Sequence, residues 1–259
     1  VKEVWRNRGR FLLVSLVIAL ITLLVLFIAA LGEGLGNGNR EYISKLDADL
    51  IVYQAKSDSL IAASRLGRDR LAAVRRVEGV ADAGMLGTAS VSLLLPASSE
   101  TLKVAMLGVE PGHTGAPTVL QGQQLSTDLA DEVIIDRNTA LRSDILLGET
   151  LTIRVTQGTR DEFFKLRVVG ITDGQQYSLQ PSLFVPFYTW DRIRPKSEAE
   201  VNSSNPIANV ILVKLQDPAQ LEVVSQRLSS QVNNVEPVTI TKAIQALPGY
   251  SAQQSTLNT

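Results

Sequence analysis

The longest uninterrupted apolar pattern of the chain lies near its N-terminus. Residues 11–31 carry no charged side chain, and sixteen of these 21 residues are Leu, Ile, Val or Phe. At 1.5 Å per residue a helix of this length spans about 31 Å, which matches a hydrocarbon core of about 30 Å. At about −0.3 to −0.6 kcal/mol for each of these side chains, insertion is favourable by roughly 5–10 kcal/mol. The pattern predicts a transmembrane helix over residues 11–31.

The charges around this run predict its direction. Four cations precede it, offset by one acid, whereas the first cation after it is Arg40. The positive-inside rule then leaves residues 1–10 in the cytoplasm and the remainder of the chain outside. Trp5 and the neighbouring cations suit the headgroup level of anionic membrane lipid. A cleaved signal peptide is the alternative, with Ala30 and Gly32 near the cleavage site, but 21 apolar residues exceed the usual 7–15.

Glycines then occupy every second position from Gly32 to Gly38. Their spacing differs from that of phosphate-binding loops, and no strand precedes them. They indicate either a flexible exit from the membrane or a helix that continues with small residues. Residues 40–46 can form a short helix.

Two strand–helix–strand patterns follow, far apart in the chain. The first has a strand at 49–54, a helix at 68–77 and a strand that begins at Val80. The second has a strand at 209–215, a helix that starts near Pro218 and a strand at 235–241. Such a pair predicts an α+β lobe with a split βαβ sheet of ferredoxin-like type. We therefore expect residues near 50 and 210 in one sheet.

The intervening chain consists mainly of short β-type runs separated by turn signals. These runs are 90–95, 101–109, 132–135, 150–156, 163–171 and 182–186. One helix is expected over 137–146. We expect an inserted, mainly β lobe, and the following organisation: cytoplasmic segment 1–10, transmembrane helix 11–31, membrane-exit linker 32–48, split lobe 49–90 and 205–242, inserted lobe 91–204, and tail 243–259.

Composition narrows the chemistry of the chain. It has no cysteine, one histidine and a formal net charge of −1, and 5% of its residues are aromatic. Disulfides and thiolate metal sites are therefore excluded, and a zinc site made only of protein ligands is disfavoured. Without a basic block or a cationic stripe interleaved with aromatics, nucleic acid is not an expected partner.

Several polar groups invite a catalytic interpretation that their surroundings do not support. His113 lies in a Pro-Gly-His-Thr turn, and catalysis there would need a nucleophile or a carboxylate nearby in space, which the sequence does not identify. The acid pairs Asp131-Glu132 and Asp47/Asp49 flank strands, as solvated residues do, and Asp136-Arg137 suits a helix N-cap. The sequence has neither a G-x-S-x-G nucleophile turn nor a Walker motif. We therefore assign no catalytic, cofactor-binding or metal-binding residue and expect a non-enzymatic protein.

Short motifs in a fixed order make the chain resemble a known family. Arg6-Asn7-Arg8-Gly9-Arg10 opens into the apolar run, and Ala48-Asp49-Leu50-Ile51-Val52 follows outside it. Five further motifs come in order: Glu78-Gly79-Val80, Gly108-Val109-Glu110-Pro111, Val133-Ile134-Ile135-Asp136, Leu147-Gly148-Glu149-Thr150-Leu151 and Val169-Gly170-Ile171. This order resembles the MacB-type (FtsX/MacB) permease subunits of ABC transporters. Ser59-Leu60-Ile61 and Asp136-Arg137 are most similar to the DevC branch.

The resemblance implies a subunit of an ABC exporter in the bacterial inner membrane. In that family four transmembrane helices are expected, with a large external domain of a porter-like and a sabre-like lobe between the first two. The tail 243–259 would lead to the second helix, and this chain would be a fragment. A homodimer, a cytoplasmic ATPase subunit that binds the ATP, and often a periplasmic adaptor are implied partners. The external domain would relay ATP-driven change to move substrate.

A single-pass extracytoplasmic sensor or binding module is the main alternative, and a secreted enzyme ranks third. Three further apolar spans downstream, with a neighbouring ATPase gene, would favour the exporter.

Overall fold

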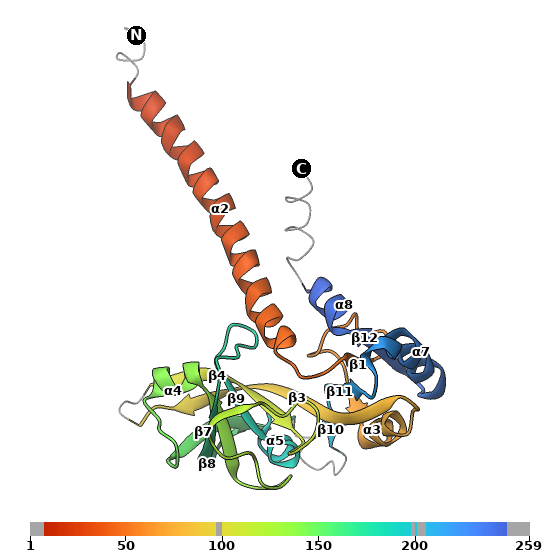
Figure 1. The fold of residues 1–259 in the computed structure, drawn as a ribbon. Helices are drawn as coiled ribbons and strands as arrows, with labels where there is room; N and C mark the ends of the chain where they lie inside the picture. The colour runs from red at the N-terminus through yellow and green to blue at the C-terminus, as the bar shows by residue number, and fades with distance from the viewer. Residues whose placement is uncertain (1–7, 97–99, 198–199, 201–205, 248–259) are drawn as a thin grey trace.

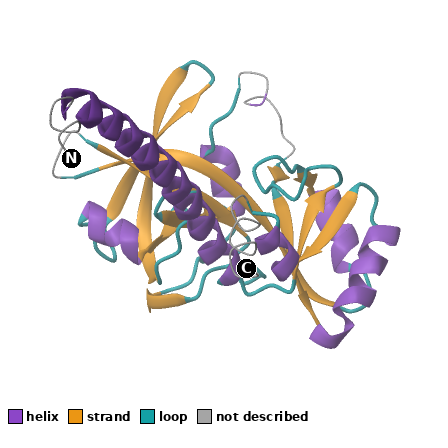
Figure 2. Cartoon of the chain, turned by 90° about the horizontal axis from the view of Figure 1, so that it is seen from above, coloured by secondary structure: helices purple, strands orange, loops and turns teal. Residues whose placement is uncertain are grey.

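The described part of the chain begins with one long helix that stands away from a domain of strands and short helices (Figure 1), and Figure 2 shows the same arrangement from above. The computed structural model describes residues 8–96, 100–197, 200 and 206–247. Helix α2 (Arg8–Ser44) has 37 residues, which corresponds to about 55 Å. It continues through residues 32–38, so the structure selects the continuing helix over a flexible exit. Most of the expected linker 32–48 is therefore helical.

The first lobe is built from both ends of the domain. Its first part has β1 (Leu50–Gln54), β2 (Leu66–Gly67), α3 (Arg68–Arg75) and the start of β3 (Val80–Leu94). Its second part has β10 (Ile207–Ala208), β11 (Val210–Leu215), the 3₁₀ turn η1 (Pro218–Gln220), α7 (Leu221–Gln231), β12 (Val235–Thr239) and α8 (Ile240–Gln245). The expected strand 235–241 thus ends earlier and turns into a helix capped by Thr239.

Four strands of this lobe lie in the order β12-β1-β11-β3, with every neighbouring pair antiparallel. Numbered along the chain, this is the 4-1-3-2 order of a ferredoxin-like split βαβ sheet. Leu50 pairs with Val213 and Ile51 with Leu212. The prediction that residues near 50 and 210 share a sheet is confirmed, and so is the α+β class.

The intervening chain closes a β-barrel. Its elements are β4 (Thr101–Val109), β5 (Val119–Gly122), β6 (Glu132–Asp136), α4 (Arg137–Ser143), β7 (Thr150–Gln157), β8 (Arg160–Thr172), β9 (Ser182–Pro186) and α5 (Phe187–Ile193). Pairings run β3-β4-β9-β6-β8-β7, and β7 pairs back with β3, so the ring is complete. Strand β5 adds to the outside of this ring through β8.

Strand β3 joins the two lobes. We expected one strand from Val80 and another over 90–95, and this separation was wrong, because β3 is a single strand of 15 residues. Leu86 pairs with Val210 of the first lobe and with Val109 of the barrel. Gly84 and Gly87 lie inside the strand, where neighbouring groups approach its backbone closely. The strand therefore crosses the expected lobe boundary at residue 90.

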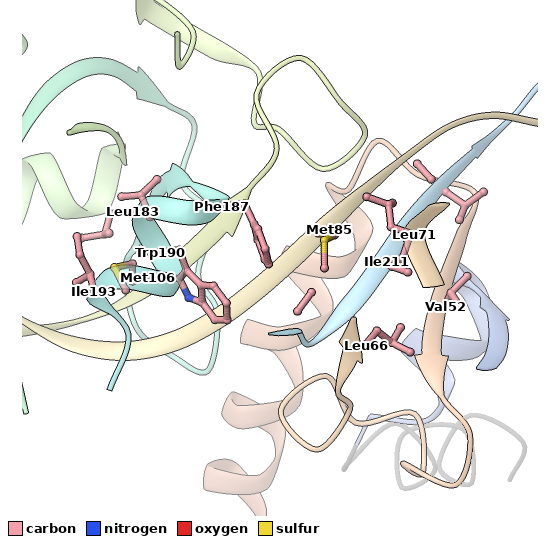
Figure 3. Packing of buried hydrophobic residues seen from close by; sticks show 14 of the residues in the cluster. Val52, Leu66, Leu71, Met85, Met106, Leu183, Phe187, Trp190, Ile193 and Ile211 are labelled. Carbon is pink, nitrogen blue, oxygen red and sulfur yellow. The ribbon is translucent and has the colours of Figure 1, made fainter. Parts of the chain in front are cut away.

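The sheet of the first lobe is buried on both faces, which explains its continuous apolar strands. On one face Leu50 and Val52 join α3, α7 and the barrel interior in one core. Figure 3 follows this core along β3, from Val52 past Met85 to Trp190. On the other face Ile51 and Tyr53 pack against the end of α2 and against α8. We call this second surface the α2 face.

Helix α5 packs on the barrel strands β3 and β4 through Trp190. Gly87 and Gly108 are cross-strand partners, and the Trp190 ring lies against both. A Cβ added at Gly87 would stand 2.5 Å from the ring, and one at Gly108 would stand 2.4 Å from Trp190 Cβ and Cγ. No side chain fits at either position without displacing the indole.

Replacing Gly87 or Gly108 by alanine should therefore lower the free energy of unfolding by about 1–3 kcal/mol, the usual cost of overpacking. Gly67→Ala is the matched control, since its Cβ would meet only the Asp69 carboxylate tip at 2.6 Å. That tip can move away. Urea titration followed by circular dichroism measures the free energy of unfolding of the three variants in nanodiscs. Equal losses of stability in all three would contradict the close packing of Trp190 on the two glycines.

Candidate functional site

The candidate site is the junction at which α2 enters the domain. Along the helix, the large apolar side chains from Leu12 to Ile28 are 45–69% exposed. Within the described residues, one stretch, Leu12–Ala30, is long and apolar enough to cross a membrane. Tyr42 and Ile43, one turn before the helix ends, are by contrast 0% and 2% exposed. The same helix thus offers one apolar surface to lipid and another to the protein core.

Tyr42 contacts both lobes. It belongs to the core cluster on the α2 face, together with Ile51, Tyr53 and Ala243 of the first lobe. Its ring also meets that of Tyr177 edge to face, with centroids 5.3 Å apart and planes at 77°. Tyr177 lies on the loop between β8 and β9 of the barrel, which Figure 1 shows rising beside the base of α2.

The hydroxyl groups of this cluster remain neutral. Burial, with a smaller contribution from Tyr177, raises the pKa of Tyr42 far above its usual value. Burial likewise raises the pKa of Tyr53 and of Tyr177. Among the residues that the structure describes, the Tyr42 hydroxyl has no hydrogen-bond partner. A buried hydroxyl without a partner costs free energy, so the aromatic ring rather than the hydroxyl stabilises this contact.

A polar contact lies beside the aromatic one. Lys45 Nζ donates to Glu41 Oε1 at 2.8 Å and to the Gly174 carbonyl at 2.5 Å, and it lies 3.5 Å from Asp173 Oδ2. Burial lowers the pKa of Lys45, but Glu41 and Asp173 outweigh it and the net shift is upward. Arg137 at the start of α4 also reaches Asp173, at 3.5 Å. Loop 173–180 is thus fastened to the end of α2 by a charged cluster as well as by Tyr177.

Two acids noted in the sequence, Asp47 and Asp49, make contacts just before the start of β1. Asp47 accepts a hydrogen bond from Lys214 Nζ at 2.5 Å. Asp49 accepts from the Leu215 amide at 2.8 Å, and its own amide donates to the Val213 carbonyl at 2.8 Å. Both residues therefore fix the chain between α2 and the sheet.

A second group of polar contacts holds the two lobes together along β3. Glu110, which is 5% exposed, accepts from Arg75 Nη2 and from the Met85 amide, each at 3.0 Å. His113 Nδ1 lies 2.9 Å from Asp82 Oδ1. Asp82 also accepts from the Thr114 amide at 2.7 Å. The structure thus places beside His113 a carboxylate, that of Asp82, which the sequence did not identify. Among the described contacts, no nucleophile is paired with His113, and its turn packs on β3.

The remaining acids considered in the sequence also have local partners. Asp136 caps α4 and accepts from the Thr139 amide at 2.6 Å, which confirms the N-cap prediction. Asp131 pairs with Arg192, and Glu132 accepts from the Ser126 amide at 2.8 Å. Within the described residues, no group of three or more His, Asp or Glu is arranged to hold a metal ion.

The junction could hardly be predicted from sequence. Tyr42 lies just after a glycine-rich stretch, and Tyr177 lies 135 residues later in a segment where Asp173-Gly174 was visible only as a turn signal. The missed elements α5 and β5 are short, at seven and four residues. Only the contact between distant segments identifies these tyrosines as partners.

Tyr42→Ala should destabilise the domain by about 3–5 kcal/mol, the usual cost of removing a buried aromatic ring. Tyr42→Phe keeps the ring and removes the unpartnered hydroxyl, so it should be neutral or slightly stabilising. Urea titration of both variants in nanodiscs measures the difference. A loss in Tyr42→Phe as large as in Tyr42→Ala would mean that the hydroxyl stabilises the junction.

Contact between loop 173–180 and α2 should weaken in acid. A hydrogen bond from the Gly174 amide, and then Lys45, lowers the pKa of Asp173. A carboxyl with a lowered pKa stabilises the folded state above its usual value of about 3.9 and loses that contribution as the pH falls through the folded pKa. Hydrogen exchange of residues 173–180 should therefore show more protection in the parent than in Asp173→Asn at pH 6, and the two should converge once the pH falls below the lowered pKa of Asp173. A difference independent of pH would contradict this assignment.

Comparison with known proteins agrees with this architecture. The model of the MacB-like periplasmic core domain matches residues 11–231. The extracellular domain of the noncanonic ABC-type transporter YknZ from Gram-positive bacteria has a similar fold, with a TM-score of 0.52 and 12% identity over 73% of this chain and 99% of that one. The periplasmic region of MacB from Actinobacillus actinomycetemcomitans gives 0.53 and 13%, over 85% and 97%.

The two solved structures support the fold, and the family model extends from the apolar helix through α7. An N-terminal apolar helix and a domain of this kind fit a membrane-anchored protein with an extracytoplasmic domain. The assignment to the DevC branch stays a prediction. The chain belongs to the MacB-like periplasmic core domain family.

Proposed function

We propose that this chain is the first helix and the external domain of a non-catalytic exporter subunit, which relays ATP-driven movement to its substrate side. The observation that carries this proposal is the continuity of α2 from the apolar span to the buried turn at Tyr42. An uninterrupted helix transmits displacement because its backbone hydrogen bonds resist bending. A flexible linker at residues 32–38 would absorb such displacement instead.

The junction divides the movement between the lobes. Tyr42 packs in one cluster with Ile51 and Tyr53 of the first lobe, and its ring contacts Tyr177 of the barrel loop. Lys45 adds a polar contact to loop 173–180. A tilt of α2 would therefore act on both lobes at once, and β3 provides the backbone connection about which they could shift.

The partners follow from this proposal. ATP would be bound by a separate cytoplasmic ATPase subunit, so no cofactor is assigned to this chain. The cations before the apolar run 11–31 favour a cytoplasmic N-terminus at the inner membrane. A homodimer and a periplasmic adaptor are further proposed partners, and membrane lipid surrounds α2.

A break in α2 tests the relay. Gly36→Pro should cost about 3 kcal/mol in the helix interior, whereas Gly36→Ala should strengthen the helix. Because about 1.4 kcal/mol corresponds to a factor of ten, export by the complete permease with its ATPase should fall roughly tenfold or more in Gly36→Pro. Export should persist in Gly36→Ala, and ATP hydrolysis should persist in both.

Equal export by both variants would contradict the relay. A complete protein that associates with no ATPase would instead favour the single-pass sensor or binding module.

A further inference from the structure

A small apolar cavity lies beside the junction. Its volume is about 240 Å³, and five segments of the chain line it. Four of its lining segments are the end of α2 with Ile43, strand β1 with Tyr53, the loop after β1 with residues 59–63, and the barrel loop with Tyr177 and Ser178. A fifth segment, Leu247 after α8, completes the lining. Ligand pockets for drug-sized molecules usually occupy about 300–1,000 Å³, so this cavity suits only part of a ligand.

The lining residues carry no charge. Ile43, Leu60 and Ile61 contribute aliphatic surface, and the polar side-chain groups are the hydroxyls of Tyr53, Ser59, Tyr177 and Ser178. An ionic group entering this cavity would lose hydration without gaining a countercharge. The cavity therefore favours a neutral apolar occupant.

Backbone strain is concentrated in the two loops that line the cavity. Seven non-glycine residues in the described chain have positive φ, and five of them lie in these loops. The five are Lys56, Asp58, Ser59, Ser178 and Leu179. Backbone strain of this kind gathers at active sites and ligand clamps.

Apolar side chains are also exposed on both loops. Leu60 and Leu179 are each 45% exposed. The cavity nevertheless lies outside the bilayer, because Ser44 follows Ala30 by fourteen residues, or about 21 Å of helix. A lipid chain in its ordinary position in the membrane would not reach Ile43. The occupant must be drawn from the bilayer or arrive through water.

We propose that this cavity binds the end of one alkyl chain of an amphiphile. An alkyl chain needs no directional partner, and its burial alone provides affinity. A peptide would be expected to use backbone hydrogen bonds or charged groups as well, and the lining offers neither a charge nor a strand edge. The site goes beyond the proposed relay and does not depend on it.

Photocrosslinking of the complete 259-residue chain in lipid nanodiscs tests this site. The probe is a fatty acid with a diazirine at its methyl end, added from water, and a second arm places the same group on the acyl chain of bilayer phosphatidylcholine. Mass spectrometry should find labels in peptides that contain residues 59–63 or 177–178. Labelling in either arm supports the site, and the arms distinguish a soluble amphiphile from a bilayer lipid.

Competition and a filled cavity give the quantitative test. Unlabelled alkanoates of increasing length should compete with the probe. The free aqueous concentration that halves the labelling should fall by a factor of about four for each added methylene, until the cavity is full. Ala63→Phe places a ring in the exposed part of the lining and should reduce labelling roughly tenfold, since it excludes more than one methylene. Ala219→Phe, on the exposed turn η1, is the matched control and should label like the parent.

Circular dichroism checks that each variant folds. If Ala63→Phe does not fold, Ala62→Phe takes its place in the same test. Labels spread along the chain without enrichment would overturn the proposal, as would equal labelling of Ala63→Phe and Ala219→Phe. Competition by acetyl-Leu-Leu-Leu-amide without competition by decanoate would replace it with a peptide site.

Discussion

The burial of Tyr42 and Ile43 on the α2 face is the contact on which the rest of the architecture depends. The large apolar side chains of α2 from Leu12 to Ile28 are exposed, whereas Tyr42 and Ile43 in its last turn are buried in protein. Two fully buried residues of this size contribute several kcal/mol of apolar burial, about 1.5–3 kcal/mol each. That is a substantial share of the stability of an ordinary domain. The membrane anchor and the domain core are therefore parts of one structure.

The sheet must be apolar on both sides for this arrangement to work. Alternate residues of β1 face opposite sides of the sheet. Leu50 and Val52 pack in one core with α3 and α7. Ile51 and Tyr53 pack on the other side against α2 and α8. A sheet with one solvated face would leave the end of α2 without a partner. The same α2 face continues to Tyr177 of the barrel loop, and so the helix contacts both lobes.

Glycines act in opposite ways in the two parts of the chain. At Gly87 and Gly108 the absence of a Cβ lets the Trp190 ring lie against paired strands. In residues 32–38 glycine weakens helix propensity by about 1 kcal/mol per residue, yet α2 is unbroken there. Composition alone therefore does not reveal whether a glycine marks a turn, a close contact or a helix.

Local pattern in the sequence determined the apolar span, its predicted direction, the α+β class and the split βαβ lobe. Each of these depends on periodicity or charge within a short window, and β1 and β11 are strong apolar runs. The tertiary structure decided that β3 is one strand, that the barrel closes through β7, and that Tyr42 meets Tyr177. These features depend on pairings between residues far apart in the chain, which no local window contains. The junction and its cavity therefore became visible only once distant segments were placed together.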